Sequence, residues 1–170
     1  MKQRGLKKPC MNCHYLIEDE GFNVNTKLKE LLRECHLDHI AISVENLEQS
    51  VKIYEALGLS FDDKREVVEE QAVTTAFAHV DERAHIELLE PYGEDGPIHQ
   101  SIKKRGPGLH HLCFRVKDVE AKASELKQNG FKLLYEKAKV GAGNCLVNFI
   151  HPKSTGGVLV EISQKIEGHK

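Results

Sequence analysis

Two histidines and two glutamates stand out among the residues that could perform chemistry: His39, Glu87, His111 and Glu161. Each glutamate lies among aliphatic residues in an expected strand, HIELLEP at 85–91 and VLVEISQ at 158–164. A carboxylate in such a strand is costly to bury unless it is paired or bound to a metal. Two imidazoles and two carboxylates suit a divalent ion of intermediate hardness, six-coordinate, with two positions left for water or substrate. The alternative is that these four are ordinary polar residues on a solvent-exposed face of a sheet.

An internal repeat favours the metal site, because it relates the four residues in pairs. Residues 37–61 and 109–133 align without a gap, which makes the two histidines equivalent. In each copy an apolar-alternating strand leads to a capping residue, Asn46 or Asp118, and then to an amphipathic helix that ends at a glycine. Further strands are expected at 59–69, 71–80 and 84–90, and at 131–135, 144–151 and 157–163. Each copy is therefore a βαβββ module.

Side-chain alternation predicts which histidines face the site. Neighbouring residues of a strand point to opposite faces, so His39 and His111 share a face that Asp38 and His110 do not. We expect the opposite face of the first strand to pack on the helix through its bulky residues, Ile40, Ile42 and Val44. Cys113 is expected to be a small apolar filler near the site. The unmatched histidines are expected on the surface or in loops: His36, His79, His85, His99 and His151.

The repeat also predicts the domain organisation. The first module covers 36–90 and the second 109–165, joined by a proline- and glycine-rich linker at 91–108 with one helical turn around Ile98 to Ile102. Residues 1–35 form an extension expected to be partly disordered, with a helical stretch at Thr26 to Glu34. Its CMNCH sequence at 10–14 has the spacing of a haem-attachment motif or of half a zinc site, with His14 or His36 as a further ligand. We interpret it as a mobile segment that contains two thiols.

Composition narrows the classes of partner and compartment. The net charge is −2, with 24 basic and 26 acidic residues, which argues against a nucleic-acid partner. No apolar run approaches the roughly 20 residues of a membrane span, so no membrane partner is expected. Five scattered cysteines argue against a disulfide framework and for a reducing compartment. The first residues lack an apolar secretion segment and the acid-poor character of a transit peptide, so we expect a cytoplasmic protein.

Several stretches together resemble the vicinal-oxygen-chelate (glyoxalase/bleomycin resistance/dioxygenase) superfamily, and within it the methylmalonyl-CoA epimerase family. They are LDHIAISVENLEQSVKIYEALGL, IELLEP, GLHHLCFRV and HPKSTGGVLVE, and the resemblance covers about residues 36–165. It implies an α+β glyoxalase-like fold, in which two tandem βαβββ modules form a curved mixed sheet around a metal site.

The resemblance also implies an activity and roles for particular residues. The metal ligands of the family fall on His39, Glu87, His111 and Glu161, and the ion would be Co²⁺, Mn²⁺, Ni²⁺ or Zn²⁺. The reaction would exchange the C2 proton of methylmalonyl-CoA, an acyl-CoA substrate, and interconvert its 2R and 2S epimers through a metal-stabilised enolate. Glu161 would be the catalytic base. A homodimer is left open.

Two features of the chain complicate this assignment. Some family members carry a second glutamate where this sequence has Thr74, so the second acid/base would be Glu87, Glu70 or a metal-bound water. The turn HPKSTGG offers Lys153 and Ser154 as anchors for the substrate's carboxylate or carbonyl, or is only a tight surface turn. The stretch at 139–145 is similarly a loop that closes over the ligand or a hairpin connection.

Three alternative functions share this fold. Glyoxalase I uses the same metal on a glutathione hemithioacetal, and the HPKSTGG turn favours the epimerase over it. A non-catalytic small-molecule-binding relative would generally lack the full ligand set. An extradiol dioxygenase would draw its iron ligands from one module, which the symmetric placement argues against.

Overall fold

The computed structural model describes residues 34–167, so the CMNCH cluster and the expected N-terminal helical stretch, apart from Glu34, lie outside the described residues. The first module consists of β1 (His36–Ser43), α2 (Leu47–Ala56), β2 (Ser60–Phe61), β3 (Glu66–Val68), a 3₁₀ turn (Glu69–Gln71), β4 (Val73–His79) and β5 (His85–Pro91). After α3 (Pro97–Arg105), the second module consists of β6 (Gly108–Arg115), α4 (Val119–Gln128), β7 (Lys139–Gly141), β8 (Cys145–Ile150), a 3₁₀ turn (Pro152–Ser154) and β9 (Leu159–Lys165).

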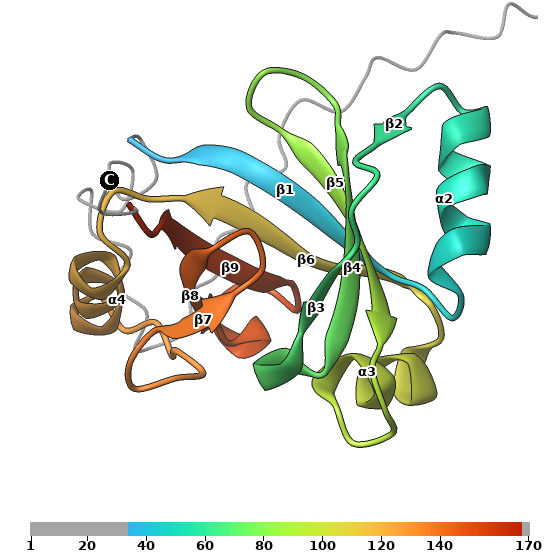
Figure 1. Cartoon of the computed structure of the whole chain (residues 1–170). Coiled ribbons are helices and arrows are strands. Elements are labelled where there is room, and N and C mark those ends of the chain that lie inside the picture. The colour runs from blue at the N-terminus through green and yellow to red at the C-terminus, as the bar shows by residue number, and fades with distance from the viewer. Residues whose placement is uncertain (1–33, 168–170) are drawn as a thin grey trace, which may run out of the picture.

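All the strands form one curled mixed sheet, which confirms the expected α+β glyoxalase-like fold (Figure 1). The strand order is β2-β4-β5-β1-β6-β9-β8-β7, with β3 paired to β4. The first strands of the two modules, β1 and β6, are antiparallel neighbours at the centre. Each has its own module's last strand on its other side, in parallel: β5 beside β1 and β9 beside β6. The four strands expected to carry the site are therefore adjacent.

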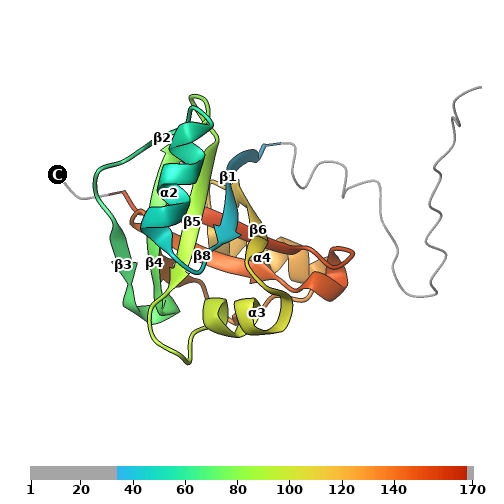
Figure 2. The same cartoon turned by 90° about the vertical axis from the view of Figure 1, so that its right-hand side faces the viewer.

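The helices cover the sheet as the apolar patterns predict. Val44 belongs to a buried cluster with Leu47 and Val51 of α2, and Ile42 packs against it. The equivalent cluster of the second module joins Val116 to the apolar side of α4. In Figure 1, α2 and α4 lie at opposite ends of the curled sheet. Figure 2 shows α3 across one end of the sheet, where it contacts β5 and β1. None of the helices in residues 34–167 is long and apolar enough to cross a membrane.

The secondary structure differs from expectation in three places. The strand expected at 59–69 is split into β2 and β3, because four consecutive charged residues at 62–65 disfavour an extended conformation. The stretch 131–135 contributes only one isolated bridge, Leu133 to Ile150, and the pairing with β8 falls instead to β7, inside the expected loop at 139–145. The single helical turn expected in the linker is the longer helix α3, which buries Ile98 and ends at Gly106, whose φ is +78°.

Candidate metal centre

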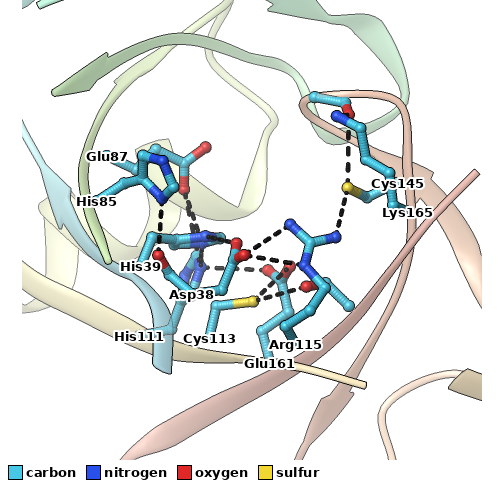
Figure 3. Close-up of polar contacts among 12 residues, drawn as sticks. Asp38, His39, His85, Glu87, His111, Cys113, Arg115, Cys145, Glu161 and Lys165 are labelled. Carbon is cyan, nitrogen blue, oxygen red and sulfur yellow. Dashed lines mark hydrogen bonds and ion pairs between the residues drawn. The ribbon is translucent and has the colours of Figure 1, made fainter. Parts of the chain in front are cut away.

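The structure brings the four predicted ligands together at the centre of the sheet. His39 lies on β1, Glu87 on β5, His111 on β6 and Glu161 on β9. All four are buried, with exposed fractions between 3% and 6%. Figure 3 shows the two imidazoles side by side, with the glutamates on opposite sides of them. The repeat and the alternation of side chains therefore located one cluster, to which each module contributes a histidine and a glutamate.

Donor atoms of three of the four residues, His39, Glu87 and His111, lie within 4.8 Å of one another, close enough to bind one ion. His39 Nε2 lies 3.1 Å from His111 Nε2 and 3.2 Å from Glu87 Oε2. His111 Nε2 lies 3.9 Å from Glu87 Oε2 and 3.2 Å from Glu161 Oε2. Neighbouring ligands at about 2.1 Å from a shared ion are about 3.0 to 3.4 Å apart. Glu161 joins this group through His111, and the four residues together offer two nitrogens and two carboxylate oxygens, a donor set for a divalent ion of intermediate hardness.

The electrostatics of the cluster also favour a bound cation. Burial lowers the pKa of His39, but the charge of Glu87 and a hydrogen bond with Asp38 raise it well above its ordinary value. Burial raises the pKa of Glu161, but the hydrogen bond and charge of His111 hold it below its usual range. Buried carboxylates here stabilise positive charge, which a proton or a metal ion supplies. Because a metal needs the neutral imidazole, the two compete.

The expected orientation of Asp38 and His110 is wrong. The pairing of β1 with β6 shifts register between Leu37 and His39, and again opposite Ala41 and Ile42, so that Asp38 and His110 each lie at a bulge. A bulge inserts an extra residue and re-aims its side chain, which breaks the alternation used for the prediction. Both residues consequently line the same pocket as His39 and His111.

The two bulge residues contact the outer nitrogens of the histidines. Asp38 Oδ2 lies 2.9 Å from His39 Nδ1, and His110 Nδ1 lies 2.9 Å from His111 Nδ1. Burial raises the pKa of Asp38, but its contacts with His39 and Arg115 lower it to about 2, so it is a carboxylate. Burial, and then the charges of His111 and Arg105, lower the pKa of His110 to about 3, so it is a neutral imidazole.

Cys113 is buried beside the cluster, where it does more than fill space. Its Sγ lies 3.4 Å from Glu161 Oε1 and 3.2 Å from Ser163 Oγ. Burial and the charge of Glu161 raise the pKa of this thiol to about 12, so it is a protonated donor. Glu161 therefore has different neighbours at its two oxygens, the thiol at Oε1 and the His111 imidazole at Oε2.

A pocket of about 300 Å³ contains the cluster. Its walls are largely apolar and come from both modules: Val73, Phe77, Leu89, Val147, Phe149 and Leu159. His85 also lines it, with Nδ1 3.0 Å from the Asp38 carbonyl oxygen, so its expected surface location is wrong. His85 is two residues before Glu87 on β5 and hence on the same face, a signal that the sequence contained.

Other residues singled out in the sequence lie outside the pocket lining. Lys153 and Ser154 lie in the second 3₁₀ turn, where Ser154 Oγ accepts a hydrogen bond from the Lys132 amide, and their substrate-binding role stays a prediction. On β4 the pocket is lined by Val73 and Phe77, which share one face, so Thr74 belongs to the other.

Comparison with known proteins agrees with this geometry. The family model of the Glyoxalase/Bleomycin resistance protein/Dioxygenase superfamily matches residues 38–149. The mitochondrial methylmalonyl-CoA epimerase of Dictyostelium discoideum is 37% identical over 131 residues, which cover 76% of this chain and 78% of that protein.

Two solved structures are similar in fold and sequence. The methylmalonyl-CoA epimerase of Mycobacterium tuberculosis is 36% identical, with a TM-score of 0.72 over 77% of this chain and 88% of the other. A variant of the Streptomyces coelicolor enzyme in complex with 2-nitronate-propionyl-CoA is 32% identical, with a TM-score of 0.73 over 77% and 97% of the two chains. Taken with the sheet and its central cluster, these matches show that the chain belongs to the glyoxalase/bleomycin resistance protein/dioxygenase superfamily, where its relatives include methylmalonyl-CoA epimerases.

Proposed function

We propose that this chain is a methylmalonyl-CoA epimerase, an isomerase that exchanges the C2 proton of methylmalonyl-CoA and so interconverts the 2R and 2S epimers. The observation that carries the proposal is the buried cluster of His39, Glu87, His111 and Glu161 inside a pocket. This cluster occurs in a chain 37% identical to a methylmalonyl-CoA epimerase. An acyl-CoA substrate is further supported by the acyl-CoA analogue in the Streptomyces structure.

The four clustered residues would hold a divalent cation. A bound cation supplies Lewis-acid stabilisation of the negative charge that develops on the substrate when C2 loses its proton. The mixed nitrogen and oxygen donors are compatible with Co²⁺, Mn²⁺, Ni²⁺ or Zn²⁺. The chain's contribution is to hold these donors in a buried position and to fix their separations before substrate binds.

Two carboxylates flank the centre and are suited to move the proton on its two sides. Glu161 is ionised although buried, so it can accept the C2 proton. A positioned base contributes about 10²- to 10⁴-fold. Among the candidates for the second acid/base, Glu87 lines the pocket from the other module, whereas Glu70 is exposed. We therefore assign Glu161 and Glu87 as the two proton-transfer groups.

The test is proton NMR of methylmalonyl-CoA in D₂O with metal-free protein, before and after addition of each of the four cations. Loss of the C2 proton signal that depends on the cation is expected. If no cation gives exchange, the substrate assignment fails, and the glutathione hemithioacetal of methylglyoxal tests glyoxalase I next. The cytoplasmic compartment stays a prediction, and the Dictyostelium relative is described as mitochondrial.

A further inference from the structure

Each candidate ligand histidine is preceded by a residue that the backbone turns inward. Asp38 and His110 both sit at register shifts between β1 and β6, at equivalent positions of the repeat. In a regular strand the residue before a ligand would point to the opposite face. The bulges place both side chains on the pocket face instead. The repeated unit therefore includes a position next to each ligand as well as the ligand itself.

The contacts made from these positions bear on which nitrogen of each imidazole carries a proton and which one faces the ion. The outer nitrogens, Nδ1 of His39 and Nδ1 of His111, each lie 2.9 Å from a bulge side chain. The inner nitrogens, Nε2 of both rings, lie 3.1 Å apart at the centre of the cluster. In a neutral imidazole one nitrogen carries the proton and the other a lone pair. A hydrogen bond donated from Nδ1 therefore leaves the lone pair of Nε2 to face the ion.

Asp38, the partner of His39, is held more firmly than His110, because it forms an ion pair with Arg115 of the other module. Asp38 Oδ1 lies 2.9 Å from Nε and 2.7 Å from Nη2 of Arg115. Asp38 Oδ2 is thereby left to accept from His39 Nδ1. Arg115 Nη1 in turn lies 2.9 Å from Cys145 Sγ on β8. Arg115, Asp38 and His39 form a continuous polar chain (Figure 3), and the ion would bind at its end, on Nε2 of His39.

We propose that Asp38, anchored by Arg115, is a positioning residue that fixes the Nδ1–H tautomer of His39 and so increases the affinity of the centre for its cation. The inference rests on the proposed function for the existence of a metal centre. It concerns a carboxylate that would not touch the ion. Removal of such a partner to a ligating histidine typically costs 10- to 100-fold in metal affinity.

The test measures Co²⁺ affinity of the metal-free protein by competition with a chromophoric chelator. Asp38→Ala is expected to weaken binding about 10- to 100-fold. Asp38→Asn keeps an oxygen that can accept from Nδ1–H but loses the charge, so its affinity should fall between those of Asp38→Ala and the wild type. Glu90→Ala is the matched control, because Glu90 is a partly buried carboxylate on β5 that accepts a hydrogen bond from the Leu47 amide. Its affinity should be unchanged.

A second readout reports the tautomer directly. In long-range ¹H–¹⁵N spectra of the metal-free protein, at an alkaline pH where the ring is neutral, His39 should show the Nδ1–H form in the wild type and in Asp38→Asn, and a mixture of forms in Asp38→Ala. Wild-type affinity in Asp38→Ala overturns the inference and leaves the proposed function intact. If Asp38→Ala fails to fold, wild-type affinity in Asp38→Asn overturns it. A wild-type protein that binds none of the cations overturns both proposals.

Discussion

The two modules contribute to the centre from equivalent strands. They supply the same types of candidate ligand, but the residues that contact the outer nitrogens of the two histidines differ. Each supplies a histidine from its first strand and a glutamate from its last strand. The residue after each glutamate, Leu88 or Ile162, is fully buried beneath the helices. In contrast, the outer partner of the first histidine is a carboxylate, and that of the second is another imidazole.

The difference shows which features the duplicated backbone determines. The strand pairings and bulges are common to both modules, so they fix where the ligands and their outer partners lie. The duplicated backbone does not determine which side chain stands at each bulge. The first module has the carboxylate of Asp38 there, and the second has the imidazole of His110. Matched substitutions in the two modules can therefore separate the effect of the shared backbone arrangement from the effect of the individual side chains.

The largest expected effect comes from substitution of the two glutamates. Glu161→Gln and Glu87→Gln should each reduce epimerisation by about 10²- to 10⁴-fold, because each removes one proton-transfer group. With the separate epimers in D₂O, each variant should still exchange the C2 proton of one epimer, and a different one in each variant. Co²⁺ absorption checks that both variants are loaded. Exchange of the same epimer by both would contradict the assignment of one carboxylate to each side.

The next effect concerns the matched core positions. Leu88→Ala and Ile162→Ala should each lower the free energy of unfolding by about 2 to 5 kcal/mol, because both create a cavity at a fully buried site. Urea denaturation of the metal-free proteins measures this. A cost confined to one variant would show that the modules do not share an equivalent core.

A smaller effect is expected from pH. In the metal-free protein the pKa of His39 is raised well above 6.5, because Glu87 and Asp38 outweigh burial. The resulting stabilisation is complete below the ordinary histidine pKa and is lost as the pH rises through the higher folded-state pKa. The free energy of unfolding should therefore fall between neutral and alkaline pH. His39→Gln should flatten this dependence, and an unaltered slope in the variant would refute the attribution.

The smallest effect is expected at the helix caps. Asn46 accepts a hydrogen bond from the Gln49 amide at 2.8 Å, and Asp118 accepts one from the Ala121 amide at 2.9 Å. Substitution of either by alanine should cost about 0.5 to 2 kcal/mol. The charge of Asp118 adds a favourable interaction with its helix, so its loss should cost more at low salt. Equal costs at low and high salt for both variants would contradict this difference.

The sequence predicted the repeated parts of the molecule well, because these depend on local patterns. The alternation around Ile42 and Val44, the caps and the helix periodicity are short-range signals, and the structure agrees with them. The repeat then brought His39, Glu87, His111 and Glu161 into one prediction, and the structure links them through contacts of the two histidines with each other and with the glutamates. The extension of α3 and the shift of pairing to β7 were missed, since tertiary contacts decide them.

The outer partners were missed for a different physical reason. Strict alternation excludes Asp38 and His110 from the site, and only a bulge reverses that conclusion. No residue type at the bulges themselves marks them, because neither Asp38 nor His110, nor the residue on either side of each, is a glycine or a left-handed residue. The link to Arg115 depends in turn on the inward position of Asp38.

The central claim is that one cation, held jointly by the two modules, supports proton exchange at C2. The most direct measurement is a titration of the metal-free protein with Co²⁺, in which bound ion and C2 proton exchange of methylmalonyl-CoA are followed together. The account predicts that exchange rises in proportion to bound Co²⁺ and saturates at one ion per chain. Exchange that is complete before any ion is added, or absent when the ion is fully bound, would contradict it.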